Sequence, residues 1–197
     1  MEKLIHFIID GGVNYIVTLG TTGETPVLSR EEKIDIIKFT EGVINNRVPM
    51  VVGIGGNNTA EVVKEIETFP LGNAAAILSA SPNYNKPSQE GIYQHYKEIA
   101  SHSSKPIILY NVPGRTCRNM SASTTIRLAN DFENIIGDKN FNKINILKKS
   151  RFTDFPFNKL NLVRNNNSTT AYLYEIMIDE NISSPKIKMM YMVLMYP

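Results

Sequence analysis

The sequence predicts an α/β fold in which parallel strands alternate with helices, and three observations support this prediction. Apolar runs recur at a spacing of roughly 30 residues, which suits a strand followed by a crossover helix. The runs are continuous rather than alternating, as at residues 49–54, which indicates strands buried on both faces of a sheet. Segments with helical periodicity lie between the runs. The runs centre near Val17, Val51, Ile77, Ile108 and Ile136.

Each predicted helix begins at a residue that commonly caps helix starts. The first begins at Ser29, where Glu32 three residues later completes a capping box, and it ends at Asn45-Asn46. The third predicted helix runs from about Ser88 to His102. The second and fourth begin near Thr59 and Ser121.

Alternating strands and helices leave two architectures, an open doubly wound sheet and a closed (β/α)8 barrel. The glycine-rich run at 53–56 is weak evidence for a dinucleotide loop, because Asn58 stands where the third glycine is needed. Polar residues at the ends of several strands favour the barrel. From about Asp138 the repeat is lost. We therefore predict a partial barrel over residues 1–140 and a divergent tail over 141–197, helical or poorly ordered.

Composition excludes several classes of function. The chain has 197 residues, 42% of them hydrophobic, and a net charge of +2, so we expect a globular protein without a nucleic-acid or membrane partner. No apolar run reaches the roughly 20 residues of a membrane span, and the start does not resemble a signal peptide. Cys117 is the single cysteine, which fits the reducing cytoplasm, and we expect it to be a small filler near a strand end. The three histidines have no metal-ligand spacing, and we expect them on helix surfaces or at interfaces. They are His6, His95 and His102.

Two motifs follow predicted strands at the end where parallel-sheet enzymes place their chemistry. Gly20-Thr21-Thr22-Gly23-Glu24 follows the run 15–19, and its hydroxyls and turn amides are suited to holding an anion. The segment 110–116, Tyr-Asn-Val-Pro-Gly-Arg-Thr, follows the run 106–109. It places a tyrosine and an arginine at a second strand end.

Together with Tyr84-Asn85-Lys86-Pro87-Ser88-Gln89-Glu90-Gly91, these motifs resemble the dihydrodipicolinate synthase / N-acetylneuraminate lyase family over about residues 1–140. The resemblance implies a (β/α)8 TIM barrel and a cytoplasmic homotetramer. It implies a lyase of lysine and diaminopimelate biosynthesis that needs no cofactor. Such an enzyme condenses pyruvate with aspartate semialdehyde, through a lysine imine, to 4-hydroxy-tetrahydrodipicolinate.

The same resemblance implies a role for each motif residue. Tyr110 would shuttle protons beside the imine, and Thr22 would relay them between Tyr110 and Tyr84, which reaches into a neighbouring subunit. Thr21 and Thr22 would bind the pyruvate carboxylate, and Arg115 the carboxylate of aspartate semialdehyde. These roles suit the chemistry, because a neutral lysine provides the electron sink, a tyrosine transfers protons, and an arginine presents a planar fork to a carboxylate.

The imine lysine is less clearly marked. Lys139 takes its position if the chain aligns without a gap after Gly137. If about four residues are deleted instead, residues 140–145 match the following helix and Lys139 is an accidental neighbour. The resemblance also implies that the family's opening strand and C-terminal third are missing or scrambled, which leaves an incomplete barrel. Two other readings stay open: another pyruvate-dependent aldolase such as N-acetylneuraminate lyase, and a non-catalytic remnant.

Overall fold

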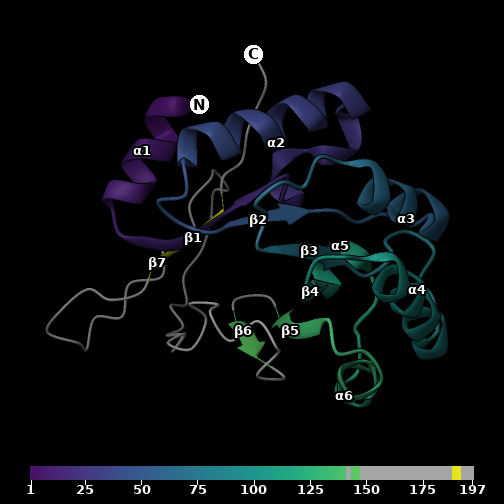
Figure 1. The fold of residues 1–197 in the computed structure, drawn as a ribbon. Helices are drawn as coiled ribbons and strands as arrows, with labels where there is room; N and C mark the ends of the chain where they lie inside the picture. The colour runs from purple at the N-terminus through teal and green to yellow at the C-terminus, as the bar shows by residue number, and fades with distance from the viewer. Residues whose placement is uncertain (141–142, 147–187, 192–197) are drawn as a thin grey trace, which may run out of the picture. The chain divides into compact units, whose positions relative to one another are not determined.

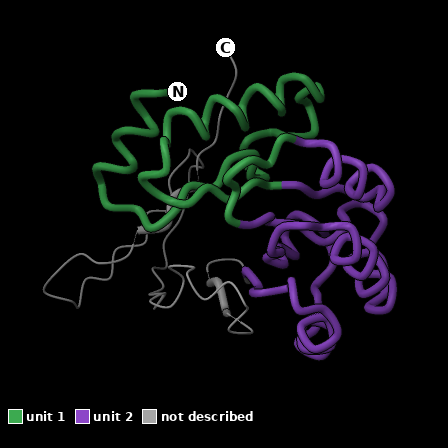
Figure 2. The backbone as a smooth tube through the Cα atoms, viewed as in Figure 1, with its two compact units in different colours: residues 1–53, 70–75, 158–197 green, residues 54–69, 76–157 purple. Residues whose placement is uncertain are grey.

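A computed structural model describes residues 1–140, 143–146 and 188–191 of the chain. These residues fall into two compact units, coloured separately in Figure 2. Unit 1 includes residues 1–53 and 70–75, and unit 2 includes residues 54–69 and 76–140. Both units alternate helices with parallel strands, so the predicted α/β class is confirmed.

Unit 1 is built around strand β1. Strand β1 pairs in parallel with β2 on one side, where Val17 lies opposite Val51, and with β7 on the other. Helices α1 and α2 lie side by side and pack on these strands (Figure 1). The elements of unit 1 are α1 (Glu2–Asp10), β1 (Val13–Thr18), the 3-10 turns η1 (Thr21–Gly23) and η2 (Thr25–Val27), α2 (Arg30–Ile44), β2 (Met50–Gly53) and β7 (Lys188–Tyr191).

Unit 2 contains three parallel strands in the order β3-β4-β5, and β6 pairs antiparallel with β5. Helix α4 packs between α3 and α6 (Figure 1). The elements of unit 2 are α3 (Thr59–Thr68), β3 (Ala76–Ala80), α4 (Gln89–His102), β4 (Ile107–Asn111), α5 (Pro113–Thr116), α6 (Ala122–Asp131), β5 (Ile135–Asn140) and β6 (Lys143–Ile146).

The predicted helix starts are confirmed, because local side chains satisfy the first free N–H groups of each helix. Ser29 Oγ accepts a hydrogen bond from the Glu32 amide, and the Glu32 carboxylate accepts one from the Ser29 amide. The side chains of Asn58, Ser88 and Ser121 accept hydrogen bonds from first-turn amides of α3, α4 and α6. Each cap of this kind stabilises a helix by about 1 kcal/mol. Helix α2, the first of the predicted helices, ends as predicted, with Asn45 and Asn46 in the left-handed region.

The described parts of the tail predicted for residues 141–197 are two short strands, β6 and β7. The remainder of that tail, residues 141–142, 147–187 and 192–197, lies outside the described residues. The domain boundary at residue 140 therefore stays a prediction.

His95 does not lie on a helix surface, which is one of the two positions predicted for the histidines. His95 is 4% exposed, its Nδ1 lies 2.8 Å from Thr59 Oγ1 of α3, and its ring meets Tyr96 edge to face. The helical period placed it on α4, but the packing of α3 against α4 decides which face of α4 is buried. Burial lowers the pKa of His95 to about 4, because desolvation disfavours the imidazolium form.

This burial predicts a stability that falls in acid. The unfolded chain binds a proton at His95 near pH 6.5, while the folded chain binds it only near pH 4. Between these values the unfolded state holds more protons, so the free energy of unfolding falls by about 3 kcal/mol as the pH decreases from 6.5 to 4. Urea unfolding at a series of pH values should show that His95→Gln flattens this part of the pH profile.

His102 provides the matched control for that experiment, because it lies on the same helix but is exposed. We expect His102→Gln to leave the acid-dependent loss of stability as in the parent chain. An equal change in both variants, or a profile that His95→Gln does not alter, would contradict the assignment of the loss to His95.

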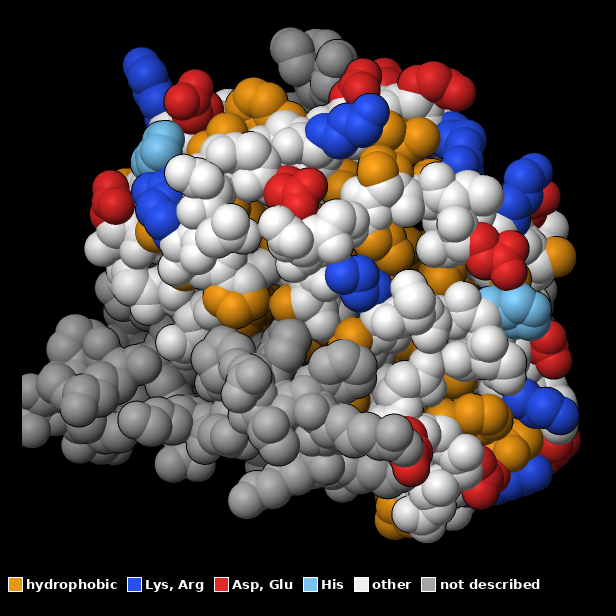
Figure 3. All heavy atoms as spheres, in the orientation of Figure 1, with side chains coloured by type: hydrophobic (Ala, Val, Ile, Leu, Met, Phe, Trp, Pro, Cys, Tyr) orange, Lys and Arg blue, Asp and Glu red, His pale blue; other side chains and the backbone are white. Residues whose placement is uncertain are grey.

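Cys117 is also placed differently from the prediction. It is exposed and so does not act as the small filler near a strand end that was predicted. It follows α5 in the left-handed region with φ of 55°. Its amide donates to the Pro113 carbonyl and closes the single turn of α5. On the face drawn in Figure 3, basic and acidic side chains are interspersed.

Candidate active site

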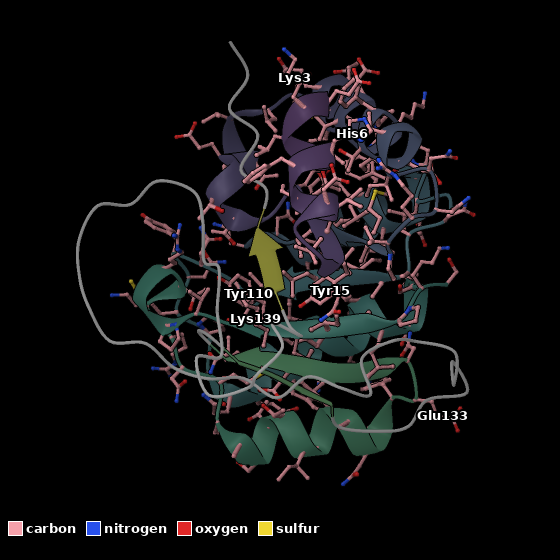
Figure 4. The ribbon with its side chains drawn as sticks, turned by 90° about the vertical axis from the view of Figure 1, so that its left-hand side faces the viewer. Lys3, His6, Tyr15, Tyr110, Glu133 and Lys139 are labelled. Carbon is pink, nitrogen blue, oxygen red and sulfur yellow. The ribbon has the colours of Figure 1, made fainter. Side chains whose placement is uncertain are left out.

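The structure brings together two of the predicted site residues, Tyr110 and Lys139. They lie opposite each other on the neighbouring parallel strands β4 and β5. The Lys139 Nζ atom lies 4.5 Å from the centroid of the Tyr110 ring, and Figure 4 shows the two side chains next to each other. Lys139 is 1% exposed and Tyr110 9%. An amine and a phenol therefore share a buried place at the strand ends of unit 2.

Asp138 precedes Lys139 on the same strand and is also buried. Successive side chains of a strand project to opposite faces of the sheet, and the register pairs Asp138 with Leu109 rather than with Tyr110. Although Asp138 and Lys139 are neighbours in the sequence, their side chains therefore project to opposite faces of the sheet. Tyr110, and not Asp138, is the side chain that shares a face with Lys139.

Arg115 lies just beyond the end of β4, in the single helical turn α5. The turn is well anchored, because the buried Thr116 hydroxyl donates to the backbone carbonyls of Val112 and Arg118. The Arg115 side chain itself is exposed. A cation at the solvent-facing edge of the strand ends is suited to receive a carboxylate from solution.

Asn111, the last residue of β4, holds the chain that follows this turn. It is 2% exposed. Its side-chain oxygen accepts from the Met120 amide at 3.0 Å, and its Nδ2 donates to the Asn119 side chain at 2.8 Å. The segment that carries Arg115 is therefore closed into a loop on the end of β4.

Tyr84 lies in a loop between β3 and α4, and its side chain is 85% exposed. Both Tyr84 and Lys86 have left-handed backbone angles, with φ of 66° and 47°, which costs free energy for residues other than glycine. Asn85 tethers the loop by donating a hydrogen bond to the Asn57 carbonyl. The structure presents the Tyr84 phenol outward on an anchored loop.

Thr21 and Thr22 belong to unit 1, where they form the 3-10 turn η1 directly after β1. Both are partly exposed. The turn is entered through Leu19, a buried residue with a left-handed φ of 55°. The proton relay from Thr22 to Tyr110 and Tyr84 stays a prediction, as does carboxylate binding by Thr21 and Thr22.

No group of three or more His, Cys, Asp or Glu residues in the described part of the chain could hold a metal ion. Within the same residues, none of the helices has the length and apolar character needed to cross a membrane. The chemistry that the described residues themselves offer is that of an amine, a phenol, hydroxyls and a guanidinium at strand ends.

Comparison with protein-family models decides the ancestry of the chain. The model described as the dihydrodipicolinate synthetase family matches residues 1–152. The chain belongs to this family. The parallel strand–helix repeat and the solved structures of the family agree, so the predicted (β/α)8 barrel fold class is confirmed.

Individual relatives agree with the family assignment. A 4-hydroxy-tetrahydrodipicolinate synthase of Flavobacterium psychrophilum is 52% identical over 139 residues, which cover 71% of this chain and 47% of the relative. A solved synthase from Acinetobacter baumannii, in complex with pyruvate, is 47% identical, with a TM-score of 0.67 over 70% of this chain and 47% of that one. One from Thermotoga maritima is 38% identical, with a TM-score of 0.68 over 71% and 47%. The chain spans about half the length of the curated relatives it matches.

Two residues that hold the loop of Arg115 in place were not predicted from the sequence. Asn111 stood inside a quoted motif, but its contacts to Met120 and Asn119 depend on how the loop folds back. Gln89 stood in another motif and proves to bind the same loop from α4. The sequence feature that could have indicated them is their position, because Asn111 is a polar residue at a strand end and Gln89 is one at a helix start.

Proposed function

We propose that this family member is a Schiff-base synthase that condenses pyruvate with aspartate semialdehyde to 4-hydroxy-tetrahydrodipicolinate. The observation that carries the proposal is the buried Lys139 amine beside the Tyr110 ring. The names of the curated relatives support the reaction, and the pyruvate complex of a solved relative supports the first substrate.

Lys139 is the imine-forming residue in this proposal. A nucleophilic lysine has to be neutral, and burial removes part of the hydration that favours an ammonium group. The amine attacks the pyruvate ketone, water leaves, and the imine withdraws electrons from the adjacent methyl carbon. Loss of a proton from that carbon gives the enamine that attacks the aldehyde of the second substrate.

Tyr110 moves the protons that imine formation requires. Its phenol lies on the strand next to Lys139 and on the same face, so it is suited to exchange a proton with the hydroxyl that leaves the ketone. A positioned acid–base group of this kind typically contributes roughly 10²–10⁴-fold to the rate. We propose that Thr22 relays the proton onward, and that Thr21 and Thr22 hold the pyruvate carboxylate through hydroxyls and turn amides.

Tyr84 completes the proton relay across a subunit interface in this proposal. Its exposed phenol, held on a tethered loop, fits a residue that acts in a neighbouring copy of the chain. The proposal accordingly includes a homo-oligomer, a tetramer by family resemblance, and a cytoplasmic role in lysine and diaminopimelate biosynthesis.

The proposal is tested by trapping. The full chain is incubated with pyruvate and borohydride, and the adduct is measured by intact mass and mapped by peptide sequencing. Reduction of the imine on Lys139 is the expected result. If saturating pyruvate gives no adduct, the proposed reaction does not occur on this chain.

A substitution of Arg115 distinguishes imine formation with pyruvate from condensation with aspartate semialdehyde. Arg115→Ala should leave pyruvate trapping unchanged and lower kcat/KM for condensation by about 10–100-fold, because charged hydrogen bonds to the second carboxylate are lost. Arg115→Lys should restore only part of this loss, since a single ammonium cannot present a planar fork. Equal losses of trapping and condensation in Arg115→Ala would contradict the role given to this residue.

A further inference from the structure

Two loops of unit 2 carry predicted site residues: the Tyr84 loop, residues 81–88, and the Arg115 loop, residues 112–121. The side chain of Gln89 joins them. Gln89 is the first residue of α4, directly after the Tyr84 loop, and it makes two hydrogen bonds within the Arg115 loop and one to a residue just beyond it. Its Oε1 accepts from the Ser121 amide at 2.9 Å and from Thr124 Oγ1 at 2.8 Å, and its Nε2 donates to the Asn119 carbonyl at 2.8 Å.

These contacts use the hydrogen-bonding capacity of the glutamine amide in a specific way. A carboxylate could accept from Ser121 and Thr124 but could not donate to Asn119, and an ammonium could not accept at all. Gln94, on the same helix, instead donates a local hydrogen bond to Glu90 four residues earlier. The difference indicates that Gln89 is placed to hold the other loop rather than to stabilise its own helix.

A second contact joins the same two loops. The Arg118 side chain donates from Nε to the Pro87 carbonyl at 2.7 Å. From the other side, Asn111 at the end of β4 binds the Met120 amide. The Arg115 loop is thus held at three places, by its own strand, by the Tyr84 loop and by the first residue of α4.

We propose that Gln89 is a positioning residue that, together with Arg118, clamps the Arg115 loop to the Tyr84 loop. The clamp keeps the backbone that carries Arg115 fixed relative to the Tyr84 loop while substrate enters and product leaves. The consequence for catalysis rests on the proposed function, in which Arg115 binds the second carboxylate in its own subunit and Tyr84 acts in a neighbouring copy of the chain. Displacement of a substrate-positioning group by about 1 Å can cost on the order of 100-fold in rate.

Hydrogen exchange of the full chain tests the clamp without any assay of activity. Gln89→Ala should raise the exchange rate of the Ser121 amide, which loses its acceptor, by about tenfold. Gln94→Ala is the matched control and should leave that amide unchanged. Arg118→Ala should raise exchange across residues 115–119 while Gln89 still protects Ser121. Equal exchange at Ser121 in the parent chain and Gln89→Ala would overturn the clamp.

The kinetic arm tests whether the clamp serves the reaction. In Gln89→Ala we expect the KM for aspartate semialdehyde to rise about tenfold, with pyruvate trapping and its dependence on pyruvate unchanged. Gln89→Glu should recover part of the loss, because two of the three contacts are retained. A uniform fall in trapping and condensation would overturn the positioning role.

The two proposals fail differently. If the parent chain yields no pyruvate adduct, the proposed function is lost, and exchange at Ser121 still decides whether the clamp exists. If the adduct forms and Gln89→Ala behaves like Gln94→Ala in both measurements, the clamp is lost and the proposed function stands.

Discussion

Lys139→Met should abolish the pyruvate adduct that borohydride traps on this chain. The substitution removes the only group that the proposal allows to form the imine, while methionine keeps a long, flexible side chain in the buried site. Without the imine there is no electron sink, so condensation should fall below detection as well. Intact-mass measurement after reduction, with saturating pyruvate, checks the prediction.

Lys97→Met is the matched control, because Lys97 is an exposed lysine on α4 of the same unit. It should give the adduct of the parent chain. A urea midpoint of Lys139→Met at or above that of the parent would show that the fold is retained, since an apolar side chain suits a buried place better than an amine. An adduct of unchanged yield in Lys139→Met, or one mapped to a different lysine, would identify Lys139 as an accidental neighbour of the motif.

Gly53→Ala should strongly destabilise unit 1. Gly53 ends β2, and a Cβ added there would overlap the Leu19 carbonyl oxygen and lie 2.7 Å from the Leu19 carbonyl carbon. Both atoms are backbone, so neither can move aside like the end of a side chain. We expect a loss of about 1–3 kcal/mol in the free energy of unfolding, measured by urea unfolding.

The close contact of Gly53 with the Leu19 carbonyl lies next to the turn that contains Thr21 and Thr22. Leu19 is the left-handed residue that leads into the turn of Thr21 and Thr22, so displacement of its carbonyl displaces the turn. Because Thr21 and Thr22 hold the pyruvate carboxylate in the proposed function, Gly53→Ala should also slow pyruvate trapping in the fraction that remains folded. Unchanged trapping in that fraction would remove Gly53 from the support of the turn.

Gly42→Ala controls for the loss of backbone freedom. Gly42 lies within α2, and a Cβ added there would have no neighbour within 4 Å. Alanine is a better helix former, so this variant should gain about 0.5–1 kcal/mol. The two glycine substitutions should thus have opposite signs, and a destabilised Gly42→Ala or a neutral Gly53→Ala would contradict the structural account.

Local pattern was sufficient to predict much of the fold. Helix starts at Ser29, Ser88 and Ser121 depend on a side chain and a backbone amide three residues apart, and all three caps are present. The parallel strands were evident from their continuous apolar runs, because a strand covered on both faces cannot expose polar side chains. The motif at 110–116 likewise placed Tyr110 and Arg115 at and just beyond a strand end.

Contacts between segments that are far apart in the sequence could be identified only from the tertiary structure. Composition and period predicted strands β1 to β5, helices α2, α3, α4 and α6 and the strand-end motifs, since these depend on residues within one or two turns of each other. Helices α1 and α5 and strands β6 and β7 have no counterpart among the predicted elements. The pairing of Tyr110 with Lys139 follows from the register of β4 against β5. The burial of His95 follows from the packing of α3 on α4. The hydrogen bond from Gln89 to Asn119 forms because a loop 30 residues later in the chain folds back onto the start of α4. Such contacts arise only when chain segments far apart are brought to within a few ångströms, and no local pattern specifies that distance.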